Sequence, residues 1–75
     1  MKRIIDNLLY DTDTAELLYY SKADRTSYYR TPNQRYFVVY SNEEFEIVNE
    51  DFVKSILGKY DIDKYIEVFG KPQEG

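Results

Sequence analysis

The stretch Arg35-Tyr36-Phe37-Val38-Val39-Tyr40 decides how this chain folds. Aromatic and β-branched residues fill it, and these residue types suit a pleated, half-buried surface. Because successive side chains of a strand point to opposite faces, Phe37 and Val39 share one face and the even-numbered residues share the other. Both faces are apolar, which predicts a central strand rather than an edge strand.

Two further strands are predicted on either side of this stretch. Thr26–Thr31 is aromatic and leads into a turn at Pro32-Asn33, where proline fixes the first turn position and asparagine tolerates the second. After the central strand, Phe45 and Ile47 alternate with glutamates, a pattern typical of a half-buried strand.

The N-terminal third predicts a hairpin. Leu8–Tyr10 and Ala15–Tyr20 flank Asp11-Thr12-Asp13-Thr14, whose side chains can bond to backbone amides two residues further on and so favour a turn. An alternative is a short helix that begins at Thr14 as its cap, but the β-rich surroundings favour the strand. The Asp-x-Asp spacing also occurs in Mg²⁺ and Ca²⁺ sites, yet the remainder of a calcium loop is missing here, so we predict turn chemistry.

The second half of the chain predicts two short helices. Asn49 is a good N-cap for the first, whose apolar residues recur at helical spacing, and Asp61 can cap the second. Gly70 followed by Pro72 is a typical stop signal. The prediction is therefore one α+β domain over residues 1–70, with a disordered tail at 71–75. Its architecture is an antiparallel meander of about four to five strands, with the two C-terminal helices packed on one face.

The composition leaves few groups for catalysis. Among the 75 residues there is no cysteine and no histidine, which removes the commonest general base and the Ser–His and Cys–His nucleophile pairs. The three glycines are scattered and form no phosphate-binding loop. We therefore expect a protein that binds rather than catalyses, with no cofactor and no metal.

The chain holds no apolar run long enough to span a membrane and opens on no secretory signal, so a cytoplasmic location is expected.

The charge is unevenly distributed along the chain. Residues 1–42 carry six basic and five acidic side chains, whereas residues 43–75 carry four basic and nine acidic ones. An acidic C-terminal part disfavours nucleic acid as its partner, because duplex binding depends on Lys and Arg contacts to phosphates. The same carboxylates could instead imitate phosphates to a nucleic-acid-binding protein with a basic groove. The simplest alternative is a solvated helical surface that keeps the protein soluble.

Aromatic and basic residues also gather on one predicted hairpin. Bases stack on sheet aromatics while arginines follow phosphates, so this hairpin is a candidate face for single-stranded nucleic acid or a nucleotide signal. Tyrosine and arginine are equally typical of protein–protein interfaces, and a tyrosine-rich sheet that merely covers a small core is the third possibility. The candidate partner-binding residues are Tyr28, Arg30, Arg35 and Tyr36 of the hairpin, with Tyr29 and Phe37 beside them, and the acids Glu43, Glu44, Glu46, Asp61 and Asp63.

Several motifs resemble a group of small uncharacterised proteins encoded in phages, prophages and integrative elements of Gram-positive bacteria. The resemblance is carried by Lys2-Arg3-Ile4-Ile5, the following Leu9-Tyr10-Asp11-Thr12-Asp13-Thr14-Ala15-Glu16-Leu17, the pairs Tyr29-Arg30 and Tyr36-Phe37, and the terminal Tyr65-Ile66-Glu67-Val68-Phe69-Gly70. The chain departs from that pattern at Val38–Asn42, where members of the group often have a longer glycine-rich stretch.

The resemblance implies a mobile-element origin. Small acidic proteins from such elements are often inhibitors of host defences, and anti-CRISPR proteins are the best-known class. It therefore implies a non-enzymatic inhibitor of a host defence nuclease such as a CRISPR effector. A homodimer is a further expectation, because so many aromatic side chains need cover in so short a chain.

Overall fold

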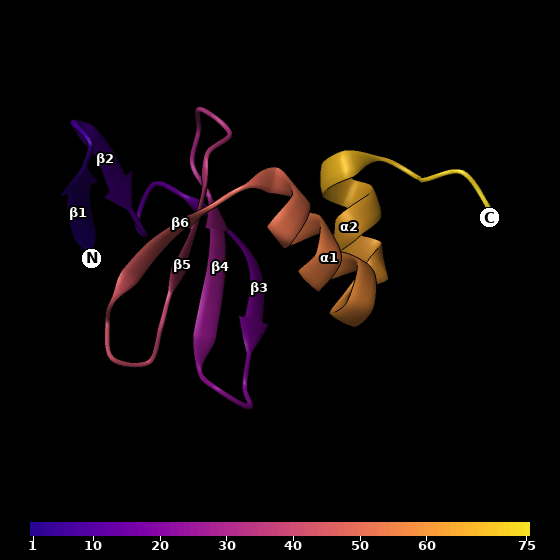
Figure 1. Ribbon diagram of the computed structural model, residues 1–75, viewed down its shortest axis with the longest axis horizontal. Helices are drawn as coiled ribbons and strands as arrows, with labels where there is room; N and C mark the ends of the chain where they lie inside the picture. Colours follow the sequence, from indigo (N-terminus) through magenta and orange to yellow (C-terminus); the bar gives the residue numbers. More distant parts are fainter.

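The computed structural model describes residues 1–75 as an α+β fold with two sheets and two C-terminal helices (Figure 1). No helix is long and apolar enough to cross a membrane. The six strands are one or two more than the sequence predicts. The elements are β1 (Lys2–Ile5), β2 (Leu8–Asp11), β3 (Glu16–Ser21), β4 (Thr26–Arg30), β5 (Tyr36–Val39), β6 (Phe45–Val48), α1 (Glu50–Tyr60) and α2 (Ile62–Phe69).

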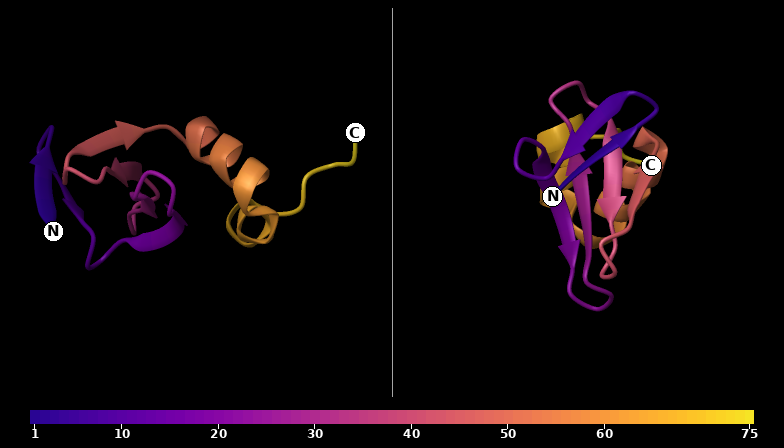
Figure 2. Two further views of the ribbon diagram at one scale, coloured as in Figure 1. Left: turned by 90° about the horizontal axis from the view of Figure 1, so that it is seen from below. Right: turned by 90° about the vertical axis from the view of Figure 1, so that its left-hand side faces the viewer.

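The main sheet is an antiparallel meander in the order β3-β4-β5-β6, and β1 and β2 form a separate hairpin. The right panel of Figure 2 shows the hairpin crossing in front of this sheet, with the two helices behind it. The molecule thus has three layers. Central strand β5 is buried along its whole length, as its two apolar faces predict.

The predicted hairpin around Asp11–Thr14 is wrong. Strand β2 pairs with β1, and β3 pairs with β4. The β1–β2 turn consists of Asp6 and Asn7, whose φ values of 52° and 65° are the positive pair that a type I′ turn requires. The segment after β2 is still a turn, because the Asp11 carboxylate accepts a hydrogen bond from the Asp13 N–H at 2.9 Å, which confirms the turn chemistry. That turn carries the chain from one layer to the next.

The helix boundaries follow the sequence signals. Asn49 caps α1 by accepting the Phe52 N–H at 2.8 Å, and Asp61 caps α2 by accepting the Lys64 N–H at 3.1 Å. Gly70 ends α2 with φ of 89°, a conformation that glycine adopts at no steric cost. Residues 71–75 form no helix or strand.

The core has one part on each face of the main sheet. On the helix side, Leu18 and Tyr36 pack against Val53 and Leu57 of α1. On the hairpin side, Tyr10 packs against residues of β5. Nine of the thirteen aromatic side chains are buried or half-buried in this way, and the other four are exposed.

Candidate binding surface

The aromatic residues of the β4–β5 hairpin point into the core rather than to solvent. Tyr28 is 8% exposed, Tyr36 is 7% exposed and Phe37 is fully buried. The cause is the three-layer architecture, because the helices cover one face of these strands and the β1–β2 hairpin covers the other. This burial corrects the prediction that Tyr28 and Tyr36 are exposed for a partner or for stacking on bases, because it leaves the two rings little open surface.

The ring of Phe37 is instead stacked between two neighbours on the hairpin side. Its centroid lies 5.1 Å from that of Tyr29 and 5.4 Å from that of Phe45, and the ring planes are within 11° of parallel. The Tyr10 ring packs edge-on against the Phe37 ring with their centroids 5.5 Å apart, and the guanidinium of Arg3 lies 5.1 Å from the centroid of the Phe45 ring. This aromatic stack holds the β1–β2 hairpin on the sheet.

A second series of aromatic contacts joins the sheet to α1. Tyr60 stacks on Tyr19 with centroids 5.8 Å apart, Tyr19 contacts Tyr28 at 5.9 Å, and Tyr28 contacts Phe52 at 6.3 Å. Burial raises the pKa of Tyr28 above its ordinary value, since desolvation disfavours the phenolate. The two ends of the series are the most exposed, with Phe52 40% and Tyr60 56% exposed, whereas Tyr19 is half-buried and Tyr28 is buried.

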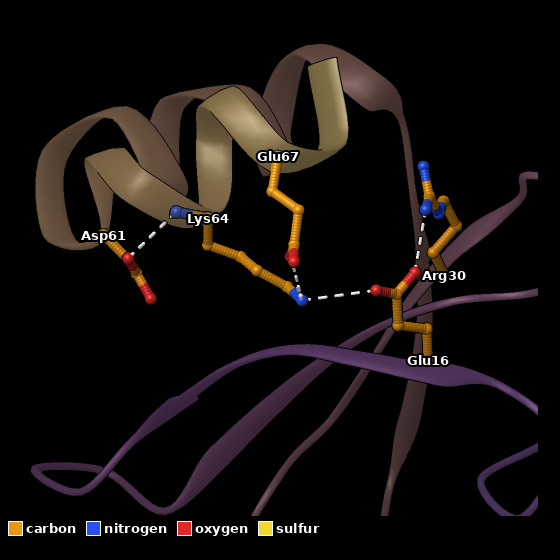
Figure 3. Close-up of polar contacts among 5 residues, drawn as sticks. All are labelled: Glu16, Arg30, Asp61, Lys64 and Glu67. Atoms are coloured by element: carbon orange, nitrogen blue, oxygen red, sulfur yellow. Dashed lines mark hydrogen bonds and ion pairs between the residues drawn. The ribbon is translucent and has the colours of Figure 1, made fainter. Parts of the chain in front are cut away.

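Arg30 is engaged in an ion-pair network between the sheet and α2 (Figure 3). Its guanidinium lies 2.7 Å from one oxygen of Glu16, and Lys64 Nζ lies 3.2 Å from the other. Lys64 also contacts Glu67 at 2.5 Å. The hydrogen bond from Arg30 lowers the pKa of Glu16, while the hydrogen bond to Glu67 raises the pKa of Lys64. Glu16 and Lys64 are 48 residues apart, and no local sequence signal marks them as a pair.

Arg35 occupies a different position from Arg30. It is exposed at the end of the β4–β5 turn and forms no ion pair. Together with Leu8, Leu9 and Tyr10 it lines a hollow of about 270 Å³ beside the β1–β2 hairpin. The structure therefore separates the two arginines and leaves only Arg35 free to contact a partner.

The predicted acids also fall into two groups on different elements. Asp61 and Asp63 lie at the start of α2 and line a hollow of about 270 Å³ with Lys64 and Glu67. Asp61 is half-buried and its carboxylate is used as the helix cap. Because the charge of Lys64 partly neutralises these carboxylates, the start of α2 is less acidic than the second group of acids.

The second acidic group lies along one edge of the main sheet and is exposed throughout. The segment 43–53 holds five carboxylates and no basic residue. We name it the acidic edge: the β5–β6 turn, β6 and the first turn of α1, with Glu43, Glu44, Glu46, Glu50 and Asp51.

Several contacts hold the acidic edge in place, and one of them is the ion pair between Lys54 Nζ and the Glu50 carboxylate at 3.7 Å. The Arg3 guanidinium donates to the backbone carbonyl of Glu43 at 3.3 Å. The Tyr40 hydroxyl donates to the carboxylate of Glu46, and this hydrogen bond raises the pKa of Tyr40 to about 12. The hydrogen bond therefore fixes the orientation of the exposed Glu46 carboxylate beside the strand.

Exposed apolar side chains lie among these carboxylates. Ile47 is 41% exposed and Phe52 is 40% exposed. Both line a hollow of about 280 Å³ with Glu46, Val48 and Asn49. Ile47 neighbours Phe37 in the sheet register but lies at the outer strand, so it is less covered than the alternating pattern of β6 predicts. The sequence gives no sign that Ile47 and Phe52 share one hollow, because they belong to different elements.

No model of a known protein family, no curated protein and no solved structure matches this chain.

Proposed function

We propose that this protein is a non-enzymatic inhibitor that binds a host defence nuclease, such as a CRISPR effector, through its acidic edge. One observation carries the proposal: the exposed Ile47 and Phe52 line one hollow with Glu46, within a segment of five carboxylates of which only Glu50 has an ion-pair partner, Lys54 at 3.7 Å. Nucleases present basic surfaces to nucleic acid, and a surface of opposite charge steers such a protein into contact and fixes its orientation. The sequence resemblance to mobile-element proteins supports host defence as the setting.

The apolar residues add to what charge alone provides. Exposed charges gain little free energy from pairing in water, whereas a partly buried apolar or aromatic side chain at the centre of an interface can contribute much more. Ile47 and Phe52 line one hollow with Glu46, so they are the apolar side chains that such an interface would use. The arrangement is suited to a protein partner with basic residues around an apolar one.

The test is a pull-down with tagged protein from a lysate of a Gram-positive bacterium that carries a CRISPR system. We expect recovery of a nuclease in stoichiometric amount, and lower nuclease activity when the protein is bound. Glu44→Lys should abolish recovery. Glu74→Lys, the matched control, makes the same charge change at an exposed residue of the C-terminal tail and should leave recovery intact. Recovery of no nuclease, or equal recovery by both variants, would count against the proposal.

A further inference from the structure

Strand β6 is an open edge of the main sheet. It pairs with β5 on one side and has no strand on the other. Among the hydrogen bonds made outside the helices and strands, and among all side-chain hydrogen bonds, none reaches the backbone of Phe45–Val48. The outward N–H and C=O groups of β6 are therefore available to another extended chain, as at other edge strands.

The charge on this edge selects what can pair with it. A second copy of β6 would bring its own glutamates beside Glu44 and Glu46, and like charges opposite each other destabilise a strand pair. Acidic side chains thus protect the edge against self-association. An incoming strand with lysine or arginine would gain from the same carboxylates.

The two faces of β6 favour different side chains in an added strand. Glu46 lies in register with Val38, which is in register with Tyr28, and Tyr28 contacts Phe52. Glu46 and Phe52 are therefore both on the helix side, where a cationic side chain could pair with the carboxylate and lie over the ring. Ile47 is on the opposite face with Phe37. Since side chains of a strand alternate, this edge fits a segment in which basic and apolar residues alternate.

We propose that β6 binds an extended basic segment of the partner protein as a fifth strand of the main sheet. Main-chain hydrogen bonds hold the segment, and the acidic edge and Ile47 select its side chains, which is the general scheme of binding by strand addition. The inference rests on the proposed function, to which it adds the class of segment recognised and the way it binds.

The probe is a capped seven-residue peptide of alternating lysine and valine, titrated into the full-length protein. We expect binding, with slower amide hydrogen exchange at residues 45–48 and no change at Glu16–Ser21 of the opposite edge strand β3. A second peptide has the same sequence with N-methyl groups on alternate residues along the hydrogen-bonding edge, so its charge is unchanged. We expect about a tenfold or greater loss of affinity, because the N-methyl groups remove several main-chain hydrogen bonds to β6.

Each outcome separates this inference from the proposed function. If both peptides bind equally and Glu44→Lys weakens both, the acidic edge binds cations but strand addition is overturned. Absence of binding by the first peptide, or protection at β3 instead of β6, also overturns it, while a pull-down that depends on Glu44 would still uphold the proposed function. If the pull-down recovers no nuclease but the peptide adds to β6 and N-methylation prevents it, strand addition stands and the proposed function falls.

Discussion

Lys64 Nζ lies 3.2 Å from the carboxylate of Glu16, and this contact joins helix α2 to strand β3 across 48 positions of sequence. The same carboxylate is 2.7 Å from Arg30 of the neighbouring strand. One glutamate thus connects the last helix with two strands of the main sheet (Figure 3). Because the groups are partly exposed, water screens the network and its contribution to stability is modest.

Removing Lys64 should loosen α2 from the sheet. We expect Lys64→Met to lower the free energy of unfolding by about 1 kcal/mol, at the upper end for solvent-screened pairs. Urea denaturation should show a lower midpoint with an unchanged slope. Lys22→Met is the control, since Lys22 is exposed in the turn between β3 and β4, forms no ion pair and should have a smaller effect. Equal losses in both variants would contradict a special role for Lys64.

The Glu16 carboxylate predicts a loss of stability in acid. Its pKa in the folded protein lies below the ordinary value of 4.5, chiefly because Arg30 donates to it. The stabilisation is therefore present above pH 4.5 and is lost as the pH falls through the lower folded value. The urea concentration at the unfolding midpoint, measured from pH 7 down to pH 2, should begin to decrease once the pH is below about 4.5. In Glu16→Gln the urea midpoint should decrease less steeply over that pH range. If the midpoint of this variant depends on pH as steeply as that of the parent protein, Glu16 is excluded as the cause.

Tyr40 should ionise late in an alkaline titration. The hydrogen bond to Glu46, with burial, raises its pKa to about 12 from an ordinary 10.0. The stabilisation from this pair is present below pH 10 and is lost as the pH rises toward 12. Near-ultraviolet titration of the folded protein should show a late tyrosinate phase that is smaller in Tyr40→Phe, in which Tyr28, whose pKa is raised by burial, remains. Glu46→Gln should move that phase to lower pH; a late phase that persists in Tyr40→Phe belongs to another tyrosine.

Asp61 has a structural role that can be separated from its charge. Its carboxylate accepts the Lys64 N–H at the start of α2, so Asp61→Ala should cost about 1 kcal/mol of stability. Asp61→Asn keeps a capping oxygen without the charge, and we expect nearly full stability in thermal unfolding. If the binding partner is retained by Asp61→Asn but lost by Glu44→Lys, the acidic edge rather than α2 forms the interface.

Leu57 is the most direct test of the contact between helix and sheet. It is fully buried among Leu18, Tyr36 and Val53, so Leu57→Ala should lower the free energy of unfolding by about 2–5 kcal/mol. A chain of this size can be largely unfolded by such a loss. Ile66→Ala is the matched control in α2, because Ile66 is 38% exposed and its loss should cost much less. Circular dichroism at increasing urea would distinguish the two.

Local signals in the sequence were sufficient for most elements of the fold. The apolar faces of residues 36–39, the turn at Pro32 and the caps Asn49 and Asp61 act over a few residues, and the structure confirms each of them. The predicted partner of β2 was wrong because β2 lies between two turns, one at Asp6-Asn7 and one at residues 11–14, and either could have set its pairing. The Asp6-Asn7 turn, with both residues in the left-handed region, pairs β2 with β1.

The candidate site was less predictable because it depends on which face each residue takes. Tyr28 and Tyr36 have the composition of an interface, yet the layers on both sides bury them. Arg30 and Arg35 are close in sequence, but only Arg30 reaches Glu16. The hollow that joins Ile47 to Phe52 arises where β6 meets α1, and no pattern within either element predicts that geometry.

The order of strands in the sheets has a consequence for how the chain folds. Every strand pairs with a strand next to it in sequence, β1 with β2 and β3 through β6 in succession. Few long loops need to close before native contacts form, and topologies of this kind fold quickly. The N-terminal hairpin can form while the remainder of the chain is still being synthesised. The contact between Glu16 and Lys64 closes a long loop, so it should form late, and its removal should accelerate unfolding more than it slows folding.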